Sequence, residues 1–222
     1  MRQWPPGGRR GSLEIRAIVR MVCAMRRLLL IFPAIFASCA MQASAPVKTE
    51  SIVLGGGCFW CVQAAYQLLP GVVSTTCGYA GGHTDNPTYE EVCTGETGHA
   101  EVVKVDFDPN VVSLDRVLAY FWKLHDPTSL NRQGPDVGTQ YRSTILYSSE
   151  AQKEVVEKSL AEAQAGYSRK IVTVVAPLTK FWRAEDYHQD YFEKHPDRDY
   201  CAYVIGPKIQ KLQKELAHQP KH

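Results

Sequence analysis

The chain has 222 residues, of which 45% are apolar and 22% are charged, an ordinary composition for a globular protein. Its formal net charge of +2 is unevenly spread, because residues 1–38 hold seven arginines and one glutamate while the remainder carries a formal charge of −4. No basic stripe is left outside this N-terminal segment, which argues against a nucleic-acid-binding protein.

The N-terminal segment has the pattern of a targeting sequence. Arg26 and Arg27 precede a short apolar run over residues 28–36. This run is too short to span a bilayer comfortably and suits the apolar core of a signal peptide. Met21 or Met25 would be a natural start for such a signal.

Two cleavage sites are consistent with this segment. Phe-Ala-Ser-Cys at residues 36–39 resembles the cleavage box of a bacterial lipoprotein, in which Cys39 would be lipidated. Ala-Ser-Ala at residues 43–45 is a conventional alternative. We therefore expect residues 1–50 to be a leader and linker, and residues 51–222 to form a single domain. The expected location is periplasmic or membrane-anchored, and it is cytoplasmic if the segment is not a working signal.

From residue 51 onward, predicted strands and helices alternate along the chain. Alternating or continuous apolar patterns predict strands at residues 51–54, 72–79, 101–107, 144–147 and 171–176. Helical spacing predicts helices at residues 62–69, 114–124, 149–165, 184–195 and 209–216. This order predicts a mixed α/β (α+β) fold of two layers, with helices packed on a small sheet.

A Cys-x-x-Cys pair lies between the first strand and the first helix. Cys58 follows three glycines and is expected at the helix N-terminus, where the helix dipole favours a thiolate and lowers the thiol pKa. Cys61 is three residues further on, which places the two side chains about 5–6 Å apart, near the range of a disulfide. Phe59 fits the apolar face of the helix, whereas Trp60 lies off it and suits a small apolar pocket.

Glu101 begins a predicted strand on the apolar face that Val103, Val105 and Phe107 share. A buried carboxyl group has a raised pKa and can keep its proton near neutrality, as a general acid requires. The alternative is a strand-end glutamate that reaches out to water. Cys77 and Cys93 are expected to be small buried apolar residues.

The Cys-x-x-Cys pair alone leaves other classes of protein open. An exported thiol–disulfide oxidoreductase would use the same pair after a strand. A metal or haem protein is weakly supported, because no His follows Cys61 for haem attachment and the chain has only one Cys-x-x-Cys.

Several short motifs in fixed order resemble the peptide methionine sulfoxide reductase A family. Gly-Cys-Phe-Trp at residues 57–60 is similar to the active-site motif of that family. The similarity covers roughly residues 51–201 and continues through residues 78–82, 86–89, 97–101, 125–127, 133–136, 138–143 and 185–189. Cys61 and Gln63 depart from the commonest family pattern, which has glycine and glutamate there.

The resemblance implies a ferredoxin-like methionine sulfoxide reductase A fold and a role for each matched residue. It implies that Cys58 attacks the sulfoxide sulfur, that Glu101 donates a proton to its oxygen, and that methionine leaves a sulfenic acid on Cys58. It also implies a substrate site that holds the sulfoxide oxygen and encloses the methyl group, formed by Phe59, Trp60, Tyr89, Asp136 and Tyr141. Enzymes of this family act on the S epimer.

A second thiol must then resolve the sulfenic acid. Cys61 is placed to do so, and Cys201 resembles the C-terminal resolving cysteine of the family. We hypothesise a relay from a Cys58–Cys61 to a Cys61–Cys201 disulfide, which thioredoxin-like proteins then reduce. No metal or other cofactor is expected, and we expect a monomer.

Overall fold

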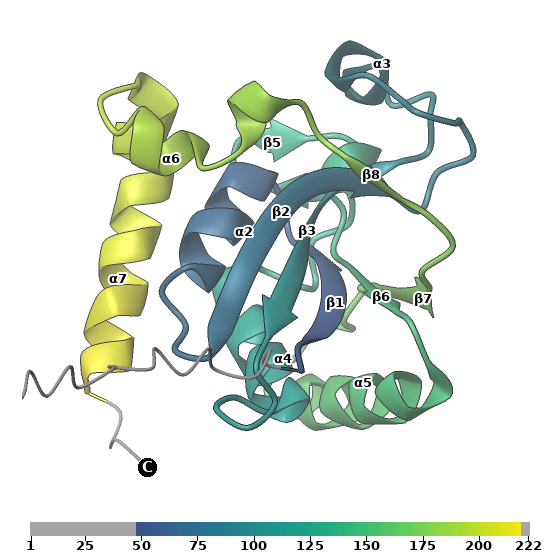
Figure 1. The fold of residues 1–222 in the computed structure, drawn as a ribbon, viewed down its shortest axis with the longest axis vertical. Coiled ribbons are helices and arrows are strands. Elements are labelled where there is room, and N and C mark those ends of the chain that lie inside the picture. Colours follow the sequence, from purple (N-terminus) through teal and green to yellow (C-terminus); the bar gives the residue numbers. More distant parts are fainter. Residues whose placement is uncertain (1–47, 219–222) are drawn as a thin grey trace, which may run out of the picture. The chain divides into compact units, whose positions relative to one another are not determined.

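The computed structural model describes residues 48–218 (Figure 1). The predicted signal segment and Cys39 lie outside the described residues. Among residues 48–218, no helix is both long and apolar enough to cross a membrane.

The centre of the fold is a six-stranded sheet in the order β7-β6-β1-β3-β2-β8. Neighbouring strands are antiparallel except for the parallel pair β6 and β7. The strands are β1 (Glu50–Gly55), β2 (Val72–Ala80), β3 (Ala100–Phe107), β6 (Thr144–Tyr147), β7 (Val174–Pro177) and β8 (Phe181–Arg183). A separate small hairpin pairs β4 (Arg132–Gln133) with β5 (Asp136–Val137).

Among residues 48–218, six α-helices and three shorter helical turns lie between and after the strands. The α-helices are α2 (Phe59–Tyr66), α3 (Tyr89–Cys93), α4 (Leu114–Leu124), α5 (Glu150–Gln164), α6 (Tyr191–Lys194) and α7 (Gly206–Ala217). The turns are η1 (Thr139–Tyr141), η2 (Asp186–His188) and a π-helical turn, η3 (Cys201–Ile205). Side chains of Thr88, Ser113 and Ser149 accept backbone N–H groups and thereby cap α3, α4 and α5.

The alternation of side chains along the strands divides the core between the two faces of the sheet. The larger cluster joins one face to the helices and includes Ile52, Leu54, Val105, Phe107, Tyr66, Leu118 and Phe121. A smaller cluster on the other face contains Val53, Ala80, Ala100, Val102 and Leu146. The predicted two-layer mixed fold is therefore confirmed.

The predicted and observed elements differ most at two places. The predicted strand at residues 171–176 begins only at Val174, and the predicted helix at residues 184–195 is split into η2 and α6. The split falls at Asp190, whose left-handed φ of 57° cannot continue a helix.

Candidate active site

A sharp turn places Cys58 at the N-terminus of α2. Gly57 has a φ of +95°, and a Cβ atom built there would lie 2.8 Å from the Cβ of Gln133, so both backbone conformation and space require glycine. Cys58 is the N-cap of α2, and its carbonyl oxygen accepts the Cys61 N–H at 3.0 Å. Cys58 and Cys61 thus occupy the N-cap and third helical positions, whose side chains meet in a capping box. The predicted placement of Cys58 is confirmed.

The predicted lowering of the Cys58 pKa is wrong. Burial raises this pKa well above its ordinary value, and the Cys61 thiol and the charge of Glu101 raise it further. The backbone N–H of Trp60 lowers the Cys58 pKa, but its effect is smaller than each of those that raise it. The predicted pKa of Cys58 rested on the helix dipole alone. In the structure the Cys58 side chain is only 7% exposed and faces the carboxyl group of Glu101. Cys58 is therefore a protonated thiol at neutral pH.

Glu101 is a buried carboxyl group next to this thiol. It lies on β3 opposite Tyr79, is 1% exposed, and accepts the backbone N–H of Phe59 on Oε2 at 3.0 Å. Burial raises its pKa to about 8, although the Phe59 N–H lowers it and Asp136 and Cys61 raise it. Glu101 therefore holds a proton at neutral pH, as the strand pattern predicted.

Two tyrosines reach the same place from separate elements. Tyr89 begins α3 and Tyr141 ends η1, and both side chains are partly buried. Burial raises both phenol pKa values, and the charge of Glu101 raises them next; the charge of Cys58 also raises that of Tyr141. Both hydroxyl groups therefore stay neutral and can donate hydrogen bonds near Glu101.

Asp136 joins this group through the small hairpin of β4 and β5. Its Oδ2 accepts the hydroxyl of Tyr200 at 2.6 Å, and its charge raises the pKa of Glu101. Asp136 also lines a cavity together with Cys58 and Cys61. The structure thus brings together the thiols, the acid and the polar side chains that the sequence singled out.

Aromatic rings form one side of the site. Phe59 is 1% exposed and belongs to the core, whereas Trp60 is partly buried. Trp60 stacks on Tyr191 with ring centroids 3.8 Å apart and an interplanar angle of 8°. Trp60 is therefore the aromatic residue of the motif that is held at the edge of the site.

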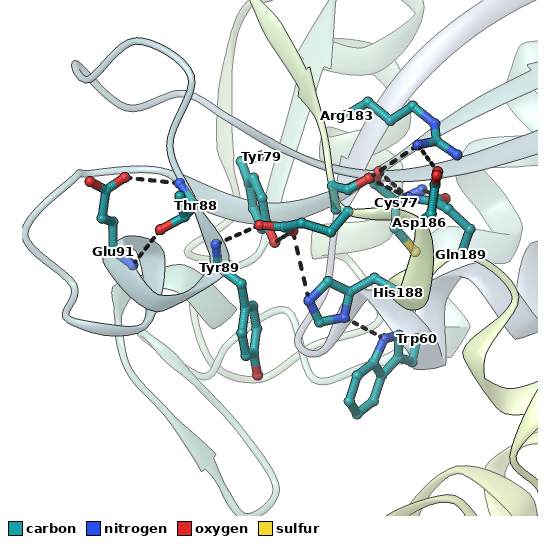
Figure 2. Close-up of polar contacts among 12 residues, drawn as sticks. Trp60, Cys77, Tyr79, Thr88, Tyr89, Glu91, Arg183, Asp186, His188 and Gln189 are labelled. Carbon is teal, nitrogen blue, oxygen red and sulfur yellow. Dashed lines mark hydrogen bonds and ion pairs between the residues drawn. The ribbon is translucent and has the colours of Figure 1, made fainter.

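His188 fixes this aromatic side, a role that the sequence analysis did not assign. Its Nδ1 accepts the indole N–H of Trp60 at 3.2 Å (Figure 2). The centroid of its ring lies 4.9 Å from that of Phe59 and 4.5 Å from that of Tyr89. Because Nδ1 accepts, the neutral ring carries its proton on Nε2, which is 3.9 Å from Glu185. Burial keeps the pKa of His188 below its usual value.

Glu185 links this histidine to the sheet and to α3. It accepts the hydroxyl of Tyr79 on Oε2 at 2.8 Å and the backbone N–H of Tyr89 on Oε1 at 3.0 Å. The motif at residues 185–189 was the only sequence feature that pointed to either residue. Glu185 and His188 contact residues that lie about 100 positions earlier in the chain, and spacing along the sequence cannot reveal such contacts.

All five cysteines between residues 48 and 218 are free thiols. Cys61 is partly buried and Cys201 is fully buried at the start of η3. A hydrogen bond from Cys58 lowers the pKa of Cys61, whereas burial and then the charge of Cys61 raise that of Cys201. Cys201 therefore lies close enough to Cys61 to sense its charge.

The remaining two cysteines differ in burial. Cys77 is 0% exposed on β2, which confirms the expectation of a small buried residue. The same expectation for Cys93 is wrong, because its side chain is exposed at the end of α3. No helix was predicted around residue 93, and the five-residue helix α3 presents its side chain to solvent.

The geometry favours chemistry at an oxygen that must be protonated before it can leave. A buried thiol, a protonated carboxyl group and two neutral phenols converge, which a simple dithiol exchange does not need. Within residues 48–218, no group of three His, Cys, Asp or Glu side chains is arranged to hold a metal ion.

A family model described as peptide methionine sulfoxide reductase matches residues 50–221. The chain belongs to this family. A peptide methionine sulfoxide reductase MsrA from Saccharolobus solfataricus is 51% identical over 165 residues, which cover 74% of this chain and 93% of the relative. A peptide methionine sulfoxide reductase MsrA from Thermus thermophilus is 53% identical over 165 residues, which cover 74% of this chain and 94% of the relative.

Solved structures agree with this membership of the peptide methionine sulfoxide reductase family. The reduced form of Mxr1 from Saccharomyces cerevisiae is 39% identical with a TM-score of 0.67, covering 71% of this chain and 91% of that chain. Methionine sulfoxide reductase A of Corynebacterium diphtheriae is 40% identical with a TM-score of 0.61, and the match covers 69% of this chain and 77% of that chain. The chain is a peptide methionine sulfoxide reductase, which returns oxidised methionine to methionine.

Proposed function

We propose that Cys58 is the nucleophile of this reduction and that Glu101 is its proton donor. The observation that carries the proposal is the hydrogen bond from the N–H of Phe59, the residue after Cys58, to the buried Glu101 carboxyl at 3.0 Å. This hydrogen bond fixes Glu101 beside the Cys58 thiol. The Glu101 pKa of about 8 keeps the carboxyl group protonated at neutral pH.

The reaction balances with these groups alone. The Cys58 sulfur attacks the sulfoxide sulfur while Glu101 protonates the sulfoxide oxygen, and Tyr89 and Tyr141 donate hydrogen bonds to that oxygen as its charge grows. The S–O bond of the substrate and the bond that the attack formed between the two sulfurs then break, and the oxygen passes to Cys58 as methionine leaves. A thiol and a sulfoxide thus give a sulfenic acid and a thioether, with no outside electron source at this stage.

The substrate is methionine S-sulfoxide, free or in proteins, and its methyl group lies against Trp60 and Phe59. The locked orientation of Trp60 between His188 and Tyr191 supports this assignment, because a rigid aromatic wall favours one placement of a small apolar group. Asp136 orients the polar side of the site through its hydrogen bond with Tyr200.

The sulfenic acid is then resolved by Cys61, and Cys201 takes over the disulfide for a thioredoxin-like dithiol to reduce. The N-cap and third helical positions of Cys58 and Cys61 support a direct disulfide between them. Electrons enter through this disulfide, so the proposal includes no bound cofactor.

Substitution of the two proposed catalytic groups tests this function. Cys58→Ser should abolish reduction of a methionine S-sulfoxide peptide, and Glu101→Gln should slow the first turnover by about 10²–10⁴-fold at pH 7. Glu157→Gln, which alters an exposed carboxyl group on α5, is the matched control and should keep the full rate. Both epimers are assayed by methionine release. A first turnover that Glu101→Gln leaves intact would remove Glu101 from the mechanism.

We also propose that residues 51–222 act as one monomeric catalytic domain on the outer side of a bacterial inner membrane, with residues 1–50 as leader and linker. The apolar run at residues 28–36 and the cleavage box at residues 36–39 support this location.

A further inference from the structure

The C-terminal segment of the chain closes a cavity over the two thiols of α2. Helix α7 lies beside α2 (Figure 1), and the cavity between them measures about 380 Å³, counting its opening to solvent. Its polar lining consists of Cys58, Cys61, Gln133, Asp136 and Lys208. Both thiols therefore share one space with one acidic and one basic side chain.

Lys208 supplies the positive charge of this cavity from the first turn of α7. A hydrogen bond from the Cys58 thiol does most to lower the pKa of Cys61, and burial opposes it. The charge of Lys208 lowers that pKa further, and the Asp136 carboxylate raises it. Lys208 thus offsets the unfavourable effect of Asp136 on a negative charge at Cys61.

Tyr200 acts on the same two groups from the residue that precedes Cys201. Its hydroxyl donates to Asp136 Oδ2 at 2.6 Å, and its ring meets that of Trp60 edge-on, with centroids 6.1 Å apart. A phenol has one proton to donate, and that of Tyr200 goes to the Asp136 carboxylate. Tyr200 therefore acts on Cys61 through Asp136, because this hydrogen bond disperses the carboxylate charge that disfavours a negative charge at Cys61.

We propose that Tyr200 and Lys208 are positioning residues for the second half of the reaction, because they stabilise the negative charge of the Cys61 sulfur as it attacks the Cys58 sulfenic acid. In this step a bond forms between the two sulfurs, the S–O bond of Cys58 breaks, and hydroxide leaves and takes up a proton to become water. Cys61 is oxidised and Cys58 is reduced to the disulfide level, so no outside reductant enters. The inference rests on the proposed role of Cys61 as the resolving thiol.

This arrangement sets the order of the two resolving cysteines. Cys201 is fully buried, and burial followed by the charge of Cys61 disfavours its thiolate. While Cys61 is a thiolate, Cys201 stays protonated beside Tyr200. Once Cys61 has joined Cys58 in a disulfide, its charge is gone and Cys201 is the next thiol available for exchange.

The test follows the lifetime of the Cys58 sulfenic acid after the methionine burst. Each variant receives one equivalent of a methionine S-sulfoxide peptide without reductant, and mass spectrometry with dimedone trapping measures the sulfenic acid and the Cys58–Cys61 disulfide. At pH 7 we expect the decay to slow about threefold both in Tyr200→Phe and in Lys208→Gln. The differences should shrink as pH rises and Cys61 ionises without help.

Two neighbouring residues provide matched controls. Tyr203→Phe alters a phenol that is 80% exposed one turn further along the chain, and Lys214→Gln alters an exposed lysine of α7 that does not line the cavity. Both should keep the original decay. Unchanged decay in Tyr200→Phe and Lys208→Gln would overturn the inference, and so would slowing by the same factor at every pH.

A Cys61→Ser variant separates failure of the inference from failure of the proposed function. If the sulfenic acid decays as fast in Cys61→Ser as in the unmodified protein, the proposed role of Cys61 fails. If Cys61→Ser blocks disulfide formation while Tyr200→Phe and Lys208→Gln do not slow it, only the inference about these two residues fails.

Discussion

Cys58 and Glu101 titrate as a pair, and the order of their pKa values sets the pH dependence of the enzyme. Glu101 loses its proton at about pH 8, whereas the pKa of Cys58 is raised well above its ordinary value by burial, by Cys61 and by Glu101 itself. The productive form is a Cys58 thiolate with a protonated Glu101, so the pair must carry one proton. Below about pH 8 it carries two, and above the Cys58 pKa it carries none.

The first-turnover rate constant at limiting substrate should therefore rise about tenfold per pH unit up to about pH 8 and then level off. In Glu101→Gln only Cys58 must ionise, so the slower rate should continue to rise past pH 8 without a break there. Rapid-quench measurement of methionine between pH 6 and 9.5 gives both profiles. A rate that falls as pH rises through 8 in the unmodified protein would contradict this ionic form.

At the scale of elements, a buried glutamine attaches the loop that carries Glu185 and His188 to the edge of the sheet. The Gln189 side chain accepts the N–H of Cys77 at 2.9 Å and donates to the carbonyl oxygens of Cys77 and Ala184 at 3.1 and 3.0 Å (Figure 2). The amide thus acts as one more strand residue beside β2, where β8 has ended.

Gln189→Met should lower the free energy of unfolding by about 1–3 kcal/mol, because it leaves the buried N–H of Cys77 without a partner. It should also raise the KM for a methionine sulfoxide peptide more than it lowers kcat, since His188 and Trp60 lose their support. Urea unfolding and steady-state kinetics measure the two effects. Gln210→Met on the exposed face of α7 is the control. If Gln189→Met unfolds at the same urea concentration as the unmodified protein, the Gln189 hydrogen bonds do not stabilise this attachment.

Local sequence patterns predicted the elements whose own residues determine them. Apolar alternation located β3, and helical spacing with a serine cap located α4 and α5, because burial on one face gives a period that the sequence displays. The short helix α3 was missed, although Thr88 and Glu91 form a capping box at its start. Strand β8 has only three residues, too few to show a period.

The sequence indicated which residues form the site better than it indicated their pKa values and contacts. The position of Cys58 followed from a strand, glycines and a helix, but its pKa depends on burial and on Glu101, 43 residues away in the sequence. His188 and Tyr200 likewise act through rings and oxygens from other elements. Such contacts are set by the folded arrangement and leave no spacing in the sequence.

At the scale of the whole molecule, the two halves of the catalytic domain each hold part of the site. The segment up to β3 supplies Cys58, Cys61, Tyr89 and Glu101, and the later segment supplies Asp136, Tyr141, His188 and the C-terminal cavity wall. Neither half contains a complete site, so activity requires the entire fold. The residues of the proposed site all lie between residues 58 and 208, which leaves targeting as the proposed role of the leader at residues 1–50.

This separation predicts how the protein is held at a membrane. If Cys39 is lipidated, the mature chain should begin there, and its mass should exceed that of residues 39–222 by the attached lipid. Residues after position 38 carry a formal charge of −4, so electrostatic attraction to an anionic bilayer cannot retain the protein. Detergent but not high salt should therefore release it, and Cys39→Ala should leave it soluble and fully active. Intact-mass measurement of the membrane fraction decides the matter, with Cys93→Ser as the thiol control. A soluble mature chain that begins at Pro46 would show conventional cleavage instead.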